Sequence, residues 1–401
     1  MGVMGREVSP EPAADLLADA HFAVPDEVPG LLAKHARRLG ALDATIFLCD
    51  FDQRLLVPLP RPGGPHREAV GVEGTLAGRA FATLSFQWNA DRTLLWVPMV
   101  EGNERLGVVG FELTGDEDDE DDDFVGAAAR LTAQAAELVA TKAAYGDFFE
   151  LYRRIEPMSI ASELAWQLLP PLTFGGDRVV ISGALVPAYD LGGDTFDYGV
   201  DQETARIAVF DAMGHALEAG LLATVAVAAY RNSRRRRLKL ADTVATIDET
   251  IRARFGPERF VTAVLGELDL GSGVFRWIRA GHPAPLLLRG SKIVKTLWGD
   301  HGLPLGLGSP GQEAEESLEP GDQLVFFTDG VTEARSSDGT FFGTERLADL
   351  VSRASAGGNP PPETLRRLVH SILDHQAGDL QDDATAVLVE WKGQGRSTLE
   401  I

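Results

Sequence analysis

The spacing of apolar and polar positions divides the first hundred residues into a helix and several strands. A helical pattern covers 31–39, and strand-like runs cover 44–51, 93–100 and 106–113. The Gly-Asn pair at 102–103 separates the last two runs and predicts a hairpin turn. We therefore expect an α/β module over residues 16–115, preceded by a loose tail that contains Pro and Glu.

A longer helical segment is predicted to begin near residue 123. Apolar residues recur in it every seven positions, at Phe124, Leu131, Leu138, Tyr145 and Tyr152. A seven-residue apolar repeat favours a left-handed coiled coil, so we predict a homodimer held by a helix over 124–152. The alternative is a helix packed on its own domain, and Gly146 interrupts the run. A second predicted helix, 159–169, ends before two prolines, so that residues 123–172 form a helical linker.

The pattern changes again from residue 175 onward. Glycine becomes frequent, and short apolar runs alternate with turn residues as far as residue 392. This pattern predicts a third segment, 175–392, that is rich in short strands. A chain of 401 residues is also too long for one ordinary compact domain.

Charge and composition exclude several classes of function. The formal net charge is −23, which repels nucleic acid and anionic lipid, so we expect neither as a partner. No apolar run of membrane length and no secretory signal is visible, so we expect a cytoplasmic protein without a membrane span. A single cysteine, Cys49, excludes an intramolecular disulfide. The acidic run 116–123 is interpreted as a solvated loop, and the basic block 234–237 as a solvated helix face or a docking patch for an acidic protein.

Four acidic positions in 175–392 share one context, the end of an apolar strand. They are Asp194, Asp211, Asp329 and the first residue of the pair Asp382-Asp383. Carboxylates at strand ends can converge on one rim of a sheet, where they repel each other unless a cation neutralises them. Oxygen ligands without Cys or several His suit Mg²⁺ or Mn²⁺. Two such ions can activate water for attack on a phosphate ester, which points to a metal-dependent phosphatase.

The order of short motifs in this segment resembles one protein family, the SpoIIE-like (RsbU-type) branch of the PPM metal-dependent Ser/Thr phosphatases. The motifs are Gly192-Gly193-Asp194-Thr195-Phe196-Asp197, Asp211-Ala212-Met213-Gly214-His215-Ala216, Ala280-Gly281-His282-Pro283-Ala284-Pro285, Gly302-Leu303-Pro304-Leu305-Gly306, Thr328-Asp329-Gly330-Val331-Thr332-Glu333-Ala334 and Asp382-Asp383-Ala384-Thr385. The resemblance implies an α/β/β/α sandwich of two mostly antiparallel sheets. It also implies a phosphorylated protein as substrate, with STAS-domain anti-sigma-factor antagonists as the usual class.

The resemblance further implies roles for single residues. Asp211 would bridge two metal ions as the central catalytic residue, with Asp329 and Asp382 completing one metal site. Asp194 and the carbonyl of Ala212 would serve the other site, and Asp383 is the less favoured member of its pair. Met213 stands where eukaryotic relatives carry a His proposed as general acid. His215 is a candidate for that role, and His282 is interpreted as a turn or packing residue.

Residues 16–115 resemble a GAF domain, a small α/β sensor module. The resemblance lies in 74–80 and in the strand pair 95–99 and 106–111. With the linker and the third segment, it predicts an α+β chain that consists of a GAF-like sensor domain, a helical linker and a phosphatase domain. We expect 159–171 to act as a switch that, in an inactive packing, leaves one metal site poorly formed, namely the site with Asp329.

Two other functions fit parts of the sequence. Gly192–Phe196 looks like the diguanylate cyclase signature, but Thr195 replaces a carboxylate that the signature needs. The chain could also be a catalytically silent, phosphatase-shaped binding or scaffold protein. Such a protein would be expected to lack a metal-ligand Asp, whereas all four are present in this sequence.

Overall fold

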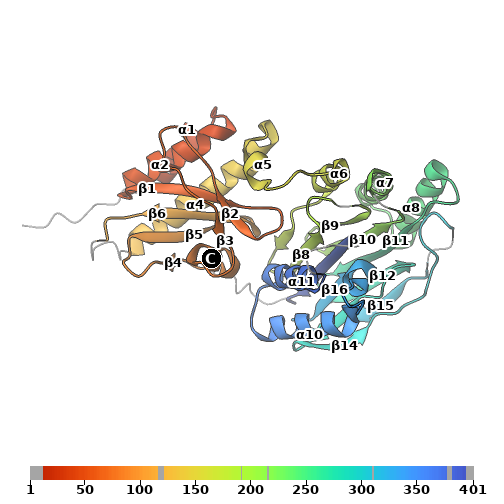
Figure 1. Cartoon of the computed structure of the whole chain (residues 1–401). Coiled ribbons are helices and arrows are strands. Elements are labelled where there is room, and N and C mark those ends of the chain that lie inside the picture. The colour runs from red at the N-terminus through yellow and green to blue at the C-terminus, as the bar shows by residue number, and fades with distance from the viewer. Residues whose placement is uncertain are drawn as a thin grey trace, which may run out of the picture. The chain divides into compact units, whose positions relative to one another are not determined.

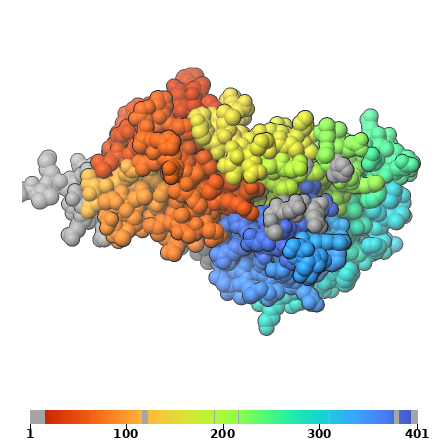
Figure 2. All heavy atoms as spheres, in the orientation of Figure 1, coloured from red at the N-terminus to blue at the C-terminus, as the bar shows by residue number. Residues whose placement is uncertain are grey.

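The described residues fold into two compact units, which divide between Glu156 and Pro157. The structure is a computed structural model that describes residues 12–115, 122–190, 192–214, 216–308, 311–376 and 382–393. Figure 1 colours the first unit red to gold and the second green to blue, and Figure 2 shows one face of the same units with all heavy atoms as spheres. None of the helices within these described ranges has the length and apolarity that a membrane span needs.

A six-stranded antiparallel sheet with the order β3-β2-β1-β6-β5-β4 forms the centre of the first unit. Its strands are β1 (Asp43–Cys49), β2 (Leu55–Pro58), β3 (Val70–Gly71), β4 (Gln87–Trp88), β5 (Leu94–Glu101) and β6 (Glu104–Glu112). Its helices are α1 (Pro12–Asp19), α2 (Val28–Leu39), α3 (Leu76–Thr83), α4 (Asp122–Lys142) and α5 (Phe148–Arg153), with short 3₁₀ turns at Pro25–Glu27 and Ala143–Tyr145. The predicted β5–β6 hairpin is present, with Glu101 opposite Glu104 and Gly102 at a φ of 57°.

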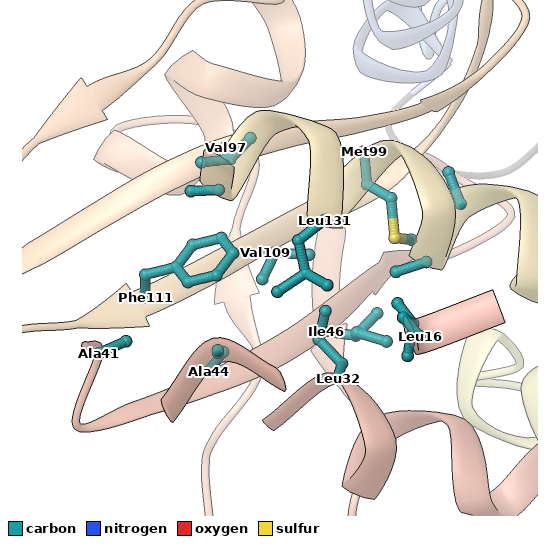
Figure 3. Packing of buried hydrophobic residues seen from close by; sticks show 14 of the residues in the cluster. Leu16, Leu32, Ala41, Ala44, Ile46, Val97, Met99, Val109, Phe111 and Leu131 are labelled. Carbon is teal, nitrogen blue, oxygen red and sulfur yellow. The ribbon is translucent and has the colours of Figure 1, made fainter. Parts of the chain in front are cut away.

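Alternation along β1 gives this sheet two apolar faces. Ile46 and Leu48 point into a core shared with α1, α2 and α4, whereas Phe47 and Cys49 point into a smaller core beneath α3. Figure 3 shows Ile46 of the first core beside Leu131 of α4. The expected α/β module is thus present, and its identity as a GAF-like sensor stays a prediction.

The seven-residue repeat contributes to the core of the first unit. Phe124, Leu131 and Leu138 are buried among residues of that core, while Tyr145 is 79% exposed. The regular α-helix ends at Lys142, and Gly146 follows a 3₁₀ turn. Helix 124–152 is therefore interrupted, and its three buried apolar positions already have partners within the unit. The homodimer stays a prediction, and its interface would have to use residues other than these three.

Two stacked antiparallel sheets make up the second unit. The first has the order β15-β12-β11-β10-β9 and the second β14-β13-β16-β17-β8-β7. The strands are β7 (Thr173–Gly175), β8 (Val179–Val186), β9 (Asp194–Val200), β10 (Thr204–Ala212), β11 (Val261–Asp269), β12 (Val274–Ala280), β13 (Leu286–Arg289), β14 (Lys292–Thr296), β15 (Ala314–Ser317), β16 (Gln323–Phe327) and β17 (Ala384–Trp391). The helices are α6 (Ile160–Leu168), α7 (Ala216–Arg235), α8 (Leu240–Phe255), α9 (Asp329–Glu333), α10 (Gly343–Ala356) and α11 (Pro361–His375).

Helices cover the outer face of each sheet. α7 and α8 pack on the five-stranded sheet, and α10 and α11 pack on the six-stranded sheet (Figure 1). Strand β10 explains the layering, because Ile207 and Val209 enter the core between the sheets while Ala208 and Phe210 face the helices. The expected α/β/β/α sandwich is confirmed.

Candidate active site

The aspartates of the first sheet lie in one row at the end of the sandwich. Asp194 and Asp211 are opposite each other on β9 and β10, and Thr262 of β11 is opposite Asp211. Each has the same parity as the residues of its strand that enter the core between the sheets, such as Phe196, Val209 and Val264. Their side chains therefore lie on the inner side of the sheet, at its rim.

Side chains of the second sheet reach this row from the opposite side. The Thr328 hydroxyl, which follows β16, donates to Asp194 Oδ2 at 2.6 Å. Asp383, just before β17, accepts at Oδ2 from the backbone N–H groups of Gly192 at 2.6 Å and Gly193 at 2.8 Å. These bonds join the rims of both sheets and fix the loop that leads into Asp194. They also distinguish the roles of Asp382 and Asp383, because Asp383 already accepts hydrogen bonds from that loop.

Asp329 and Asp382 lie together on the wall of a cavity of about 210 Å³. Asp329 is the first residue of α9 and Asp382 precedes β17, and both are exposed. Gly330, Glu333, Ala334, Arg335 and Gln376 complete the lining. The cavity is the solvent-accessible side of the aspartate rim.

Burial and mutual repulsion raise the pKa of the carboxyl groups at this rim. Burial, followed by the charges of Asp211 and Asp383, holds the pKa of Asp194 well above its ordinary value. Burial and the charge of Asp329 raise the pKa of Asp211 to about 7. Burial raises the pKa of Asp383 to about 6, and burial with the Asp329 charge raises that of Asp382. Carboxylates that disfavour their own ionisation in this way favour a bound cation.

The donor set fits a hard divalent cation. The rim carries carboxylate, hydroxyl and backbone oxygens, and oxygen atoms are the ligands that Mg²⁺ and Mn²⁺ prefer. Within the described parts of the chain, no three His, Cys, Asp or Glu side chains are arranged so that they could hold a metal ion. The fold therefore brings the carboxylates close enough to raise each other's pKa, but not into a complete coordination shell. The assignment of individual ligands stays a prediction.

Ala212, whose carbonyl is the expected backbone ligand, ends β10 against Gly193. Its N–H donates to the Gly193 carbonyl at 3.2 Å. A Cβ on Gly193 would lie 2.3 Å from the Ala212 oxygen, so only glycine permits this approach. The Gly-Gly pair before Asp194 is thus required by the packing of the site.

His282 is buried and has a polar partner at the rim, which the sequence did not indicate. Its Nδ1 lies 2.8 Å from the Thr262 hydroxyl, which in turn donates to Asp211 Oδ2 at 3.2 Å. Burial lowers the pKa of His282 to about 3, so the imidazole is neutral. The prediction that His282 is a turn or packing residue agrees with its burial, but it did not include the contact with Thr262. Thr262 had no motif to mark it, because only the pairing of β10 with β11 brings it to Asp211.

Arg335 and Gln376 are further residues that sequence reasoning missed. Arg335 is exposed, lines the cavity and stacks over the Phe341 ring at 4.6 Å. Gln376 is 6% exposed and its Oε1 has no hydrogen-bond partner within the described residues. Arg335 directly follows the Thr328–Ala334 motif, and this position was the one sequence signal for it. His215, the candidate general acid, lies outside the described residues.

A helix-covered double β-sheet with aspartates from four separate segments at one rim defines a class, the PPM-type serine/threonine phosphatases. Residues 201–392 match the family model described as "Stage II sporulation protein E (SpoIIE)". The second unit therefore contains a SpoIIE-family phosphatase domain. The cyclase interpretation of Gly192–Phe196 is set aside, because these residues belong to this domain fold.

The chain is also similar to individual proteins. The chain is 23% identical over 239 residues to "Phosphoserine phosphatase RsbU" of Bacillus subtilis, covering 59% of this chain and 70% of that protein. It is 32% identical over 133 residues to "Protein IcfG" of Synechocystis, covering 32% of this chain and 20% of that protein. A crystal structure of the RsbU and RsbW domains of Rv1364c from Mycobacterium tuberculosis matches with a TM-score of 0.49 and 24% identity, covering 54% of this chain and 62% of that one.

Proposed function

We propose that this chain hydrolyses phosphoserine or phosphothreonine on a protein partner in a reaction that requires Mn²⁺ or Mg²⁺. The observation that carries the proposal is the meeting of Asp194, Asp211, Asp329 and Asp382 at one rim of a SpoIIE-family sandwich. Two ions held there would neutralise substrate phosphate and lower the pKa of an attacking water. Asp211, which lies within the reach of all the other rim charges, is proposed to serve both ions.

The chain's own residues prepare this reaction. Thr328 and Asp383 hold the Asp194 loop in place, and the close contact of Gly193 with Ala212 directs that backbone toward the rim. Arg335 supplies a positive charge on the cavity wall beside Asp329, and we propose that it binds the phosphate or an adjacent acidic group of the substrate.

The proposed substrate is a phosphorylated STAS-domain protein of the type that controls a sigma factor. Support comes from the SpoIIE family match and from the similarity to RsbU. Phosphate release from purified phosphorylated STAS proteins, compared with p-nitrophenyl phosphate in Mn²⁺, tests this proposal. We expect a higher kcat/KM for the protein substrate, and equal values for both substrates would reject the STAS assignment.

Arg335→Ala provides a test of substrate binding in the same assay. Losing a charge-assisted contact should raise the KM for the phosphoprotein by about 10- to 100-fold. Arg346→Ala is the matched control, because Arg346 also stacks on a phenylalanine, Phe342, but does not line the cavity. An unchanged KM in Arg335→Ala would remove Arg335 from the substrate site.

Regulation through α6 is the second part of the proposal. Trp166 Nε1 of α6 donates to the Ala188 carbonyl and the Ser159 N–H donates to the Tyr189 carbonyl, both at 2.8 Å. Both acceptors belong to the segment that leads to Asp194. Arg231 of α7 donates to the Leu168 carbonyl at the end of α6 and also pairs with the buried Asp197. We infer that a movement of α6 would act on the Asp194 side of the rim rather than on Asp329, and that a signal at the sensor-like unit drives it.

Trp166→Phe tests this coupling because it removes one indole N–H and keeps an aromatic ring. Loss of one hydrogen bond should raise the Mn²⁺ concentration for half-maximal activity by roughly 2- to 10-fold, with little change in KM for substrate. Trp391→Phe is the control, since Trp391 Nε1 also donates to a carbonyl, that of Leu270, at the other end of β17. Identical metal dependence in both variants would reject a role of α6.

A further inference from the structure

A chain of hydrogen bonds runs from His282 through Thr262 to Asp211, and the proposed reaction gives neither His282 nor Thr262 a role. All three residues come from different segments, with Asp211 on β10, Thr262 on β11 and His282 two residues after β12. Thr262 and Asp211 are direct cross-strand partners, and His282 is only 1% exposed. The hydrogen-bond chain is therefore fixed by the sheet, with its His282 end buried and Thr262 and Asp211 half-buried at the rim.

The chemistry of a hydroxyl group sets the direction of this chain. Thr262 Oγ1 carries one proton, which it donates to Asp211 Oδ2 at 3.2 Å. For Thr262 to donate its proton to Asp211, the 2.8 Å contact must be donated by His282 Nδ1–H, and we assign this tautomer from the hydrogen-bond pattern. Without that donor the hydroxyl could rotate its proton away from the carboxylate.

Neighbouring residues hold His282 in this position. Arg279 Nη1 donates to the His282 carbonyl at 3.3 Å, and the Gly281 N–H donates to Gly302 O at 2.9 Å. The N–H and carbonyl of Leu305 pair with Val261, directly before Thr262. The Ala280–Pro285 and Gly302–Gly306 motifs, which had no chemical role in the sequence, thus form the support of this chain.

We propose that His282 and Thr262 are positioning residues that orient the Asp211 carboxylate for metal binding. The bond to Oδ2 fixes the rotation of the carboxylate plane and leaves the remaining lone pairs directed at the rim. Residues of this kind keep a ligand in its productive geometry, and their loss commonly weakens metal affinity by about 10- to 100-fold. The inference rests on the proposed metal-dependent function, since it assigns Asp211 as a ligand.

The test is calorimetric titration of the full chain with Mn²⁺, which is independent of turnover. Thr262→Val keeps the shape of the side chain and removes the hydroxyl, so we expect Mn²⁺ affinity to fall by about 10- to 100-fold. Thr262→Ser restores the hydroxyl and should bind within a few-fold of wild type. Thr204→Val, at the other end of β10, is the matched control and should leave Mn²⁺ affinity unchanged.

Variants of His282 separate positioning from packing. His282→Asn places an amide donor close to the position of Nδ1 and should retain most of the affinity, whereas His282→Leu should resemble Thr262→Val. Because the residues act as one chain, Thr262→Val with His282→Leu should bind no more weakly than Thr262→Val alone. Thermal unfolding of each metal-free variant shows whether a loss of Mn²⁺ affinity is accompanied by a loss of stability.

The outcomes are distinguishable. If wild type binds Mn²⁺ and Thr262→Val binds it equally well, the positioning role is wrong while the proposed function stands. The same holds if Thr262→Val and Thr262→Ser lose affinity equally, or if affinity falls only in proportion to lost stability. If wild type itself binds no Mn²⁺, the metal-dependent function fails and this inference fails with it.

Discussion

Asp211→Asn is expected to reduce phosphatase activity by about 10³-fold or more. A metal held at the rim would provide several kcal/mol of transition-state stabilisation, and each 1.36 kcal/mol lost costs a factor of ten in rate. Asn removes the charge at the position that every other rim carboxylate influences. Phosphate release at saturating Mn²⁺ measures this effect. Asp201→Asn, at the opposite end of the β9–β10 hairpin, is the control and should keep wild-type turnover.

The same variant should be more stable than wild type when no metal is present. Burial and neighbouring charges raise the pKa of Asp211 to about 7, so above this pH the folded protein holds an unfavourable ionised carboxylate. This cost grows as pH rises from the ordinary value of 3.8 through about 7 and is absent below it. Asn relieves it at pH 8, and each 1 kcal/mol gained should raise Tm by roughly 2–4 °C for a unit of this size.

A stability gain with an activity loss would be the signature of a functional carboxylate cluster. Added Mn²⁺ should then raise the Tm of wild type but hardly that of Asp211→Asn. Equal or lower stability of the metal-free variant at pH 8, combined with normal turnover, would remove Asp211 from the site.

Gly330→Ala is the second substitution with a large expected effect. A Cβ at this position would lie 1.8 Å from the carbonyl oxygen of Asp383 and 2.8 Å from its carbonyl carbon. Backbone atoms cannot give way as a flexible side chain can, so α9 and the start of β17 must separate. Asp329 and Asp382, which share one cavity wall across this contact, would be displaced from each other.

We expect Gly330→Ala to lose about 1–3 kcal/mol of stability and about 100-fold in activity. Activity should fall more than stability predicts, because a displacement of about 1 Å is enough to disturb a catalytic site. Thermal unfolding and phosphate release measure the two effects. Gly271→Ala serves as control, since its Cβ would meet no atom nearer than 3.4 Å. Wild-type activity in Gly330→Ala would contradict the described packing of the rim.

Local pattern was sufficient to predict much of the fold. The helices at 31–39 and 159–169 are observed as Val28–Leu39 and Ile160–Leu168, and Ser159 caps the second through the Ser162 N–H. The heptad spacing was ambiguous, because a helix that packs on its own sheet also buries every seventh residue. The structure buries Leu131 and Leu138 within the first unit, and no sequence spacing distinguishes that outcome from a dimer seam.

The candidate site was only partly visible in the sequence. Short motifs identified the aspartates at strand ends, and the basic block 234–237 drew attention to Arg234, one of two arginines, with Arg231, that lie near each other on α7. The structure assigns these two arginines to the buried Asp197, which is a tertiary pairing that charge patterning cannot foresee. Thr262 lies 51 residues from Asp211, so only the strand register joins them. Residues that orient a ligand across strands carry no local signal of their own.

The central claim is that the aspartate rim binds divalent metal and hydrolyses phosphate esters with it. The most direct measurement is phosphate release from p-nitrophenyl phosphate by the full chain after EDTA treatment and dialysis, with Mn²⁺ then titrated back. We expect no turnover without metal and a saturable recovery on adding Mn²⁺, with no recovery in Asp211→Asn. Undiminished turnover in excess EDTA, or recovery in Asp211→Asn equal to that of wild type, would contradict the account.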